Sequence, residues 1–263
     1  MRPGEKFETE CYNFLKKVYK TANTDFYHEG GMDSTKSDIE VIKNGKKDFF
    51  IEAKDALAQS GQFVLLPNKN TETFIFSPRN KSLPNEMTNM IIDYMNNDFH
   101  RFNNAGTAGQ SIDIDKKIFA KWIIKHYEEK NVKYVISKGN DYVIFPIRKF
   151  PEYFDIVANF RVKKSGSGYV AKKDIDLVKQ NILAIYPTAK FIQSGKKLYV
   201  EINEPFKKDK LIIKNYTYQL SKQSSNYFEV RRLSNTYNMN VIFAIKLIKA
   251  QDENDLIEFK SEI

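Results

Sequence analysis

The chain has a single cysteine, Cys11, among its 263 residues. One cysteine excludes an intramolecular disulfide framework and a cysteine-rich zinc site. The three histidines, His28, His100 and His126, lie far apart in the sequence, so a His-rich metal site is not expected. No stretch has the roughly 20 apolar residues of a membrane-spanning helix, and no apolar run follows Met1 as in a signal peptide. We therefore expect a cytoplasmic protein without membrane contact.

Charge is abundant and unevenly placed. Lys and Arg number 42 against 33 Asp and Glu, which gives a formal net charge of +9. Residues 161–232 hold 16 basic and 6 acidic residues, whereas the rest of the chain holds 26 and 27, so this segment carries the whole positive excess. Clustered Lys and Arg displace counterions from phosphates, which makes a polyanion the partner that we favour. The alternative is a solvated, lysine-rich surface.

Hydrophobic periodicity predicts a chain that mixes helices and strands. Helices are expected over 4–22, 85–102, 115–130 and 173–185. Strands are expected over 36–43, 47–54, 62–66, 73–77, 133–137, 141–146, 156–162, 189–194, 197–202, 210–214, 216–220, 226–233 and 239–248. This order indicates three small α+β units. The unit near 168–222 is an expected insertion, because the linker-like segment 163–168 opens it and 221–226 closes it.

Two neighbouring predicted strands carry the residues with the clearest chemistry. Asp38 stands near the start of the first strand, and Glu52, Ala53 and Lys54 end the second. Residues two apart in a strand share a face, so Glu52 and Lys54 point together and Ala53 points away. If Asp38 faces Glu52, two carboxylates and one ammonium converge. Two carboxylates suit Mg²⁺, which stabilises charge on a phosphate, and the ammonium can orient a water or neutralise developing charge.

The turn between these strands sets a geometric condition. A strict two-residue loop at Asn44-Gly45 would pair Asp38 with Ile51, on the wrong face, so a three-residue loop or a bulge must restore the facing. The triplet alone is unspecific. The same form occurs in helix-like stretches, where positions two apart do not share a face, at 115–117, 128–130 and 258–260. The alternative interpretation is a surface hairpin with a Glu–Lys ion pair.

Asp38 with Glu52 and Lys54 resembles the motif of the PD-(D/E)xK nuclease superfamily, with Ser37 where the name-giving proline would stand. A narrower likeness, to the HhaI-type restriction endonucleases, rests on DSTKSD (33–38), FFIEAK (49–54), QSGQFVLLPN (59–68), FPI (145–147), YF (153–154), RVKKSGS (161–167) and LSNTYN (233–238). The likeness spans most of the chain but is poor over 169–225. The hairpin is two residues longer than the family's, which keeps the facing unchanged.

The resemblance implies a type II restriction endonuclease that makes Mg²⁺-dependent double-strand cuts in duplex DNA at a short GC-rich site, GCGC. It implies a monomer that nicks the strands in turn, and a cognate DNA methyltransferase in the cell without a stable complex. By match, Asp38 and Glu52 are metal ligands, the carbonyl of Ala53 is a further ligand, and Lys54 is the catalytic lysine.

The fold implied by the resemblance is an α+β (mixed α/β) PD-(D/E)xK core. A central mixed β-sheet is flanked by helices, and two further small mixed-sheet units accompany it. We expect a catalytic domain over 1–110, a sequence-recognition domain over 111–167 and 223–263, and an inserted basic domain over 168–222 for non-specific DNA contact.

Candidate DNA contacts lie near the motif and at both ends of the expected insertion. Gln59 and Gln62 could bond a phosphate or a base edge, the alternative being turn chemistry around Gly61. Arg and Lys pair with guanine in the major groove. The candidates at the ends of the insertion are Arg161, Lys163, Lys164, Ser165, Arg231 and Arg232. Three asparagines either touch bases or only cap turns: Asn235, Asn238 and Asn240.

Other features are weaker. Glu8 could support the metal site through water, but we interpret it as a solvated helix residue. The segment 166–171 fits G-x-G-x-x-A without following an apolar strand directly, so nucleotide binding is not expected. Trp122 and Tyr127 have the spacing of helix core. Two alternatives stay open, a non-catalytic sequence-specific DNA-binding protein and a structure-specific nuclease of DNA repair or junctions.

Overall fold

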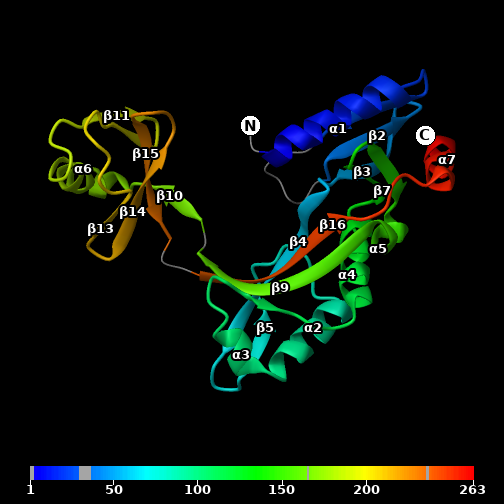
Figure 1. Cartoon of the computed structure of the whole chain (residues 1–263), viewed down its shortest axis with the longest axis horizontal. Helices are drawn as coiled ribbons and strands as arrows, with labels where there is room; N and C mark the ends of the chain where they lie inside the picture. Colours follow the sequence, from blue (N-terminus) through cyan, green and yellow to red (C-terminus); the bar gives the residue numbers. More distant parts are fainter. Residues whose placement is uncertain (1–2, 30–36, 165, 235–236) are drawn as a thin grey trace. The chain divides into compact units, whose positions relative to one another are not determined.

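The computed structural model describes residues 3–29, 37–164, 166–234 and 237–263. The chain divides into two compact units, unit 1 with residues 1–162 and 239–263, and unit 2 with residues 163–238. Helices and three β-sheets are distributed over both units (Figure 1), which confirms the predicted α+β class. None of the described helices is both long and apolar enough to cross a membrane.

The first sheet of unit 1 is mixed and lies between helices. Its strands, in spatial order, are β1 (Thr24–His28), β2 (Ile39–Lys43), β3 (Lys46–Ala53), β7 (Val132–Lys138) and β8 (Tyr142–Pro146). β3 and β7 run parallel and the other pairs antiparallel. On one face, Ile51 packs in a core with Cys11 of α1 (Pro3–Tyr19) and Phe259 of α7 (Glu253–Glu262). On the other face, Phe50 and Val135 pack in the core that holds α4 (Lys116–Glu128).

The β2–β3 hairpin meets the geometric condition by a bulge. The loop is the two-residue turn Asn44-Gly45, with φ values of 50° and 74°, as the favoured hairpin turns require. The register then shifts by one, since Ile42 pairs with Lys47 but Val41 pairs with Phe49. Continued by one position, the shifted register sets residue 38 opposite residue 52. β1, which pairs along β2, was not predicted from the sequence.

The second sheet of unit 1 is built from distant segments. In spatial order it contains β5 (Thr73–Phe76), β4 (Leu57–Asn68), β16 (Tyr237–Leu247), β9 (Phe154–Lys164) and β6 (Gln110–Ser111). Its core includes α2 (Glu86–Asn96), α3 (Phe99–Asn103), α4 and α5 (Phe150–Tyr153), and the short helix η1 (Ile147–Lys149) precedes α5. The single helix predicted over 85–102 is two helices, because the chain leaves α2 at Asn97. The strand predicted over 62–66 is longer than expected, since β4 continues through Pro67, which pairs with Phe74.

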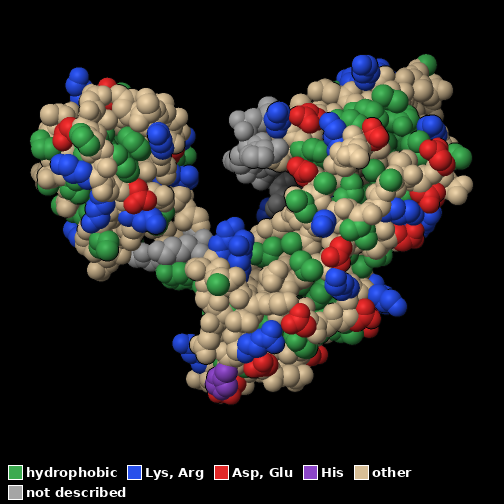
Figure 2. All heavy atoms as spheres, viewed as in Figure 1, with side chains coloured by type: hydrophobic (Ala, Val, Ile, Leu, Met, Phe, Trp, Pro, Cys, Tyr) green, Lys and Arg blue, Asp and Glu red, His purple; other side chains and the backbone are tan. Residues whose placement is uncertain are grey.

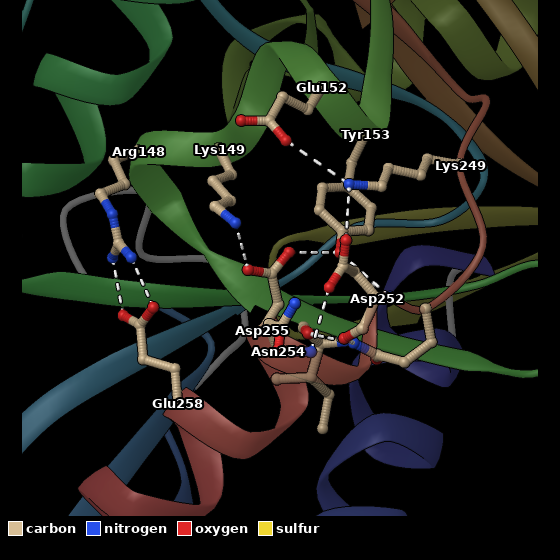
Figure 3. A network of polar contacts seen from close by, with 11 residues as sticks. Arg148, Lys149, Glu152, Tyr153, Lys249, Asp252, Asn254, Asp255 and Glu258 are labelled. Carbon is tan, nitrogen blue, oxygen red and sulfur yellow. Dashed lines mark hydrogen bonds and ion pairs between the residues drawn. The ribbon is translucent and has the colours of Figure 1, made fainter.

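A network of ion pairs holds α7 against the rest of unit 1 (Figure 3). Asp255 is 1% exposed and receives hydrogen bonds from the Lys149 ammonium at 2.6 Å and the Tyr153 hydroxyl at 2.5 Å. At the surface, the Arg148 guanidinium donates to both carboxylate oxygens of Glu258. The buried carboxylate therefore has partners from the segment that follows β8, and α7 is anchored beside the first sheet.

Unit 2 is a small antiparallel sheet with one helix. Its elements are β10 (Ser167–Tyr169), η2 (Lys172–Asp174), α6 (Ile175–Leu183), β11 (Lys190–Ser194), β12 (Lys197–Glu201), β13 (Lys210–Ile213), β14 (Tyr216–Lys222) and β15 (Tyr227–Leu233). The strand order is β11-β12-β15-β14-β13, and β10 pairs with β15. Val178 and Ile182 of α6 pack against the sheet in a separate core. The expected linker 163–168 is largely strand, because β9 continues to Lys164 and β10 begins at Ser167.

The positive charge belongs to unit 2. Residues 163–238 contain 15 Lys and Arg against 6 Asp and Glu, whereas unit 1 contains 27 of each. Figure 2 shows Lys and Arg side chains spread over the visible face of unit 2. The first sheet includes β7 and β8, which lie beyond residue 110. The separate roles that we expect for three domains stay a prediction: 1–110, 111–167 with 223–263, and 168–222.

Candidate active site

Asp38, Glu52 and Lys54 come together at the end of β3. The Asp38 Oδ2 accepts a hydrogen bond from the Ala53 amide at 2.9 Å, which fixes Asp38 against β3. The Lys54 ammonium donates to the Glu52 Oε1 at 2.6 Å. Both side chains are largely buried, with exposed fractions of 16% for Lys54 and 8% for Glu52. The ion pair of the surface-hairpin interpretation is therefore present, but it is buried beside a second carboxylate.

The charges in this cluster depend on one another. The pKa of Asp38 is raised to about 8. Burial is the largest cause and the carboxylates of Glu52 and Glu8 contribute to the rise, whereas Lys54 and the Ala53 amide oppose it. Burial alone would lower the pKa of Lys54. The negative charges of Glu52 and Asp38 outweigh that effect, so the pKa of Lys54 stays well above its usual value and the side chain is an ammonium.

Glu8 belongs to the surroundings of this cluster. Its side chain, on α1, is 20% exposed, and its Oε2 lies 3.8 Å from the His28 Nε2. Burial raises the pKa of Glu8, the positive charge of Lys54 lowers it, and the negative charge of Glu52 raises it. The interpretation of Glu8 as a solvated helix residue is therefore wrong. The sequence contained one hint, because Glu8 lies one helical turn before Cys11, which faces the sheet.

The donor set fits a hard divalent cation that keeps water ligands. Among the described residues, no group of three or more His, Cys, Asp and Glu side chains is close enough to hold a metal ion. Asp38 and Glu52 supply two carboxylates, and Mg²⁺ usually takes one or two of these together with waters and substrate phosphate. A cation beside the two carboxylates would also relieve the repulsion that raises the pKa of Asp38.

Tyr127 of α4 packs against the cluster. It is 3% exposed, as its spacing in the helix predicted, and the Lys54 ammonium lies 5.6 Å from the centroid of its ring. Its hydroxyl is 3.3 Å from the Ser60 hydroxyl on β4. The helical spacing indicates that Tyr127 is buried. It does not show that Lys54 lies over its ring, because Lys54 is more than 70 residues away in the sequence.

A second bulge brings Gln59 and Gln62 together. Ile242 pairs with Gln62 and Ala244 with Gln59, so two residues of β4 lie opposite one residue of β16. Gly61 has a φ of 101°, and a Cβ there would lie 2.7 Å from the Trp122 ring, so a side chain does not fit. Both glutamines are exposed, and the Gln59 Nε2 donates to the Gln62 Oε1 at 3.1 Å. The bulge around Gly61 therefore also places the side-chain amides of Gln59 and Gln62 next to each other.

Arg161 is held near the end of β9 in unit 1. Its Nε is buried and has no hydrogen-bond partner within the part of the chain that the structure describes. Gly109, with a φ of 88°, lies against it, because a Cβ at this glycine would be 3.1 Å from the Arg161 Cβ. Gly109 therefore packs closely against the Cβ of Arg161, and the Nε–H of this arginine is a donor that a ligand could accept from.

Arg231 and Arg232 lie in unit 2, on β15. The Arg231 Nη2 donates to the Ser167 carbonyl at 3.4 Å, and its Nε is 3.9 Å from a Glu229 oxygen. The Arg232 guanidinium lies 4.7 Å from the centroid of the Tyr216 ring. Because the two arginines are adjacent in a strand, they point to opposite faces of the sheet.

The other predicted DNA contacts are dispersed. Lys163 is exposed, Asn238 is half-buried and Asn240 is 3% exposed, opposite Val64 in the second sheet. Lys164 ends β9. Ser165 and Asn235 lie outside the described residues.

Comparison with known proteins identifies the family. No protein-family model and no curated protein matches the sequence. Among solved structures, HhaI endonuclease in complex with DNA is similar over 98% of this chain and 97% of that chain, with a TM-score of 0.83 and 32% identity. The chain belongs to the HhaI-type restriction endonucleases. The match confirms the predicted family and fold, and it identifies a type II restriction endonuclease rather than a non-catalytic DNA-binding protein.

Proposed function

We propose that this HhaI-type endonuclease cuts both strands of duplex DNA at GCGC by Mg²⁺-dependent hydrolysis of the phosphodiester. The observation that carries the proposal is the placement of Asp38 beside Glu52 and Lys54 by the bulged hairpin. These residue types at this spacing match the catalytic motif of the family, and the similar structure is that of an endonuclease with DNA.

Each residue of the cluster has a separate role. Asp38 and Glu52 would hold Mg²⁺ with the carbonyl of Ala53, and the bound ion supplies stabilisation of phosphate charge and a more acidic water. The Lys54 ammonium, held by Glu52 at 2.6 Å, donates a hydrogen bond to the scissile phosphate and orients the attacking water. Tyr127 restricts the lysine to this position.

Recognition and general DNA contact are divided between two sets of residues. Arg161, whose Nε lacks a partner among the described residues, and Arg231 are the candidates for guanine contacts. Gln59 and Gln62 contact DNA near the cleaved bond. Unit 2, with its 15 basic and 6 acidic residues, supplies most of the phosphate contacts. The enzyme acts as a monomer, and the cognate DNA methyltransferase protects the host site without binding the nuclease stably.

A plasmid digestion tests the proposal. Two plasmids are compared that differ only in a single GCGC site, which is intact in one and changed at one base in the other. We expect Mg²⁺ to give one linear product from the first plasmid and none from the second, and chelation to stop both reactions. Run-off sequencing of the ends then locates the cut. A smear, cleavage after chelation, or ends at another sequence would each contradict the proposal.

A further inference from the structure

A second lysine lies beside the catalytic cluster, just after α4. The ammonium of Lys130 is 5.6 Å from the centroid of the Tyr127 ring, the same distance as the ammonium of Lys54. The two ammonium groups are therefore at most about 11 Å apart, twice this distance. The hydroxyl of Tyr127 is held at Ser60, so one fixed ring places both lysines.

The turn after Lys130 is tied to the strand that carries Glu52. Asn131 has a φ of 58°, and its Nδ2 donates to the Asp48 carbonyl at 2.7 Å. The Phe50 amide donates to the Asn131 carbonyl at 2.9 Å. Because Phe50 and Glu52 are two residues apart on β3, this turn fixes the backbone of Lys130 relative to the active-site carboxylates.

The electrostatic surroundings of Lys130 are those of the active site. Burial lowers the pKa of Lys130, Glu52 and Asp38 raise it, and Lys54 and Lys81 lower it. Two further ammonium groups, those of Lys54 and Lys81, therefore act on Lys130. Gathering like charges costs free energy unless an anion offsets it, and the nearby carboxylates are the ones that a metal ion would occupy. When a metal ion occupies these carboxylates, a DNA phosphate bound here would be a further counter-charge for the ammonium groups.

We propose that Lys130 binds a backbone phosphate of the cleaved strand within two nucleotides of the scissile phosphodiester. This inference rests on the proposed function, in which Lys54 contacts the scissile phosphate. Phosphates of one strand repeat every ~3.4 Å along the helix axis and lie further apart than that through space, so the distance between the two lysines spans about two of them. Lys130 places the DNA for cleavage and takes no part in proton transfer.

The first test measures binding without a metal ion. Lys130→Gln, Lys130→Arg and the control Lys125→Gln are compared on a GCGC duplex at several salt concentrations. Lys125 is an exposed lysine of α4, the helix that ends just before Lys130. We expect Lys130→Gln to bind about 10- to 100-fold more weakly and to lower the salt slope by ~0.9. Lys130→Arg and Lys125→Gln should keep the wild-type slope. An unchanged slope in Lys130→Gln would overturn the proposal.

The second test identifies the phosphate. Four duplexes are compared, and each carries a single uncharged methylphosphonate. The substituted positions are the first and second phosphates on either side of the scissile phosphate. We expect one of them to weaken wild-type and Lys130→Arg binding and to abolish the difference between wild type and Lys130→Gln. A difference that persists on every duplex overturns the proposal, as does a wild type insensitive to all four. If Lys130→Gln does not fold, the scan of wild type and Lys130→Arg decides. The salt slope needs neither Mg²⁺ nor cleavage, whereas the scan takes the position of the scissile phosphate from the mapped ends. A failure of the proposed reaction and a failure of the Lys130 contact are therefore distinguishable.

Discussion

The charge of Lys54 limits the chemistry that this residue can perform. Because Glu52 and Asp38 hold the pKa of Lys54 well above its usual value against the effect of burial, the side chain is protonated at neutral pH. An ammonium has no lone pair and cannot remove a proton from water. In the protein without bound metal, Lys54 is therefore a hydrogen-bond donor and a positive charge beside Glu52.

We expect Asp38→Ala and Lys54→Ala to lower the single-turnover cleavage rate by at least about 10²-fold and to leave DNA binding largely intact. The first removes a proposed metal ligand, and the second removes the donor at the phosphate. Rates are measured at saturating enzyme, and binding is measured in gel shifts without metal. Asp55→Ala, at an exposed residue next to Lys54, is the control. Cleavage by either variant at the wild-type rate would show that the site is misassigned.

His126 provides a prediction about acid stability. The pKa of His126 is lowered from 6.5 to about 4, mainly by burial and also by the charges of Lys130 and Lys54. Between pH 4 and 6.5 the unfolded chain therefore binds more protons at this residue, so stability falls as the pH falls through this window. The ring stacks on Trp122. In His126→Phe, which keeps a stacked ring, we expect the loss between pH 7 and pH 4.5 to be smaller by about 2 kcal/mol in urea titrations. Equal losses in both proteins would contradict this.

At the scale of elements, the hairpin shows what the sequence could decide. The alternation in β3 predicts that Glu52 and Lys54 share a face, and the requirement that Asp38 meet them predicts an irregular hairpin. Asn44-Gly45 is a strong turn signal, but nothing in the sequence marks Asp48 as the extra residue of the bulge. The choice depends on the core, because Val41 and Phe49 are both buried under α1 and α7 only in the shifted register.

We expect Asp255→Ala to destabilise unit 1 by about 3 kcal/mol. The carboxylate is 1% exposed, and its removal leaves the Lys149 ammonium and the Tyr153 hydroxyl without their shared acceptor. Denaturant unfolding followed by near-ultraviolet circular dichroism measures the loss. Glu253→Ala, an exposed residue in the first turn of the same helix, is the control and should change stability by less than about 0.5 kcal/mol. If Asp255→Ala lowers stability as little as the control does, α7 is held by its apolar contacts alone.

At the scale of the whole molecule, charge proved more informative than segment boundaries. Counting Lys, Arg, Asp and Glu along the sequence locates the positive excess within 161–232, and the compact unit over 163–238 carries nearly the same residues. The strand pairing in the second sheet of unit 1 could not be predicted from the sequence. It joins β4 to β16 across more than 170 residues, and no local pattern specifies such a pairing. Long-range pairing is set by burial of Phe63 and Phe243 in one core.

The proposed monomer with a single active site predicts the order of products. We expect supercoiled plasmid to be converted first to nicked circles and then to linear DNA, because the described chain brings together one cluster of Asp38, Glu52 and Lys54. A time course at low enzyme concentration, resolved on agarose gels, measures the three forms, and analytical ultracentrifugation measures the mass. Linear DNA that appears without a nicked intermediate would rule out the single-site scheme.

The five lysines of one set test whether unit 2 contacts only phosphates: Lys196, Lys197, Lys207, Lys208 and Lys210. All lie in unit 2, and all except Lys197 are exposed. Substituting Gln at these positions should weaken binding to cognate and non-cognate duplexes by similar factors. The salt slope should fall by ~0.9 for each phosphate that a substituted lysine no longer neutralises, and the cut sequence should stay the same. Binding is measured on a GCGC duplex and on one changed at one base, at several salt concentrations.

The opposite result is expected at the two arginines, and this contrast makes the test decisive. Arg161 and Arg231 each present guanidinium donors that can pair with guanine, so Arg161→Ala or Arg231→Ala should reduce discrimination between the two duplexes by about 1–3 kcal/mol. Their effect on the salt slope should be small, because a base contact releases few counterions. If the lysine set changes discrimination while its salt slope stays fixed, unit 2 reads bases through its lysines. The division between phosphate contact and base recognition would then be wrong.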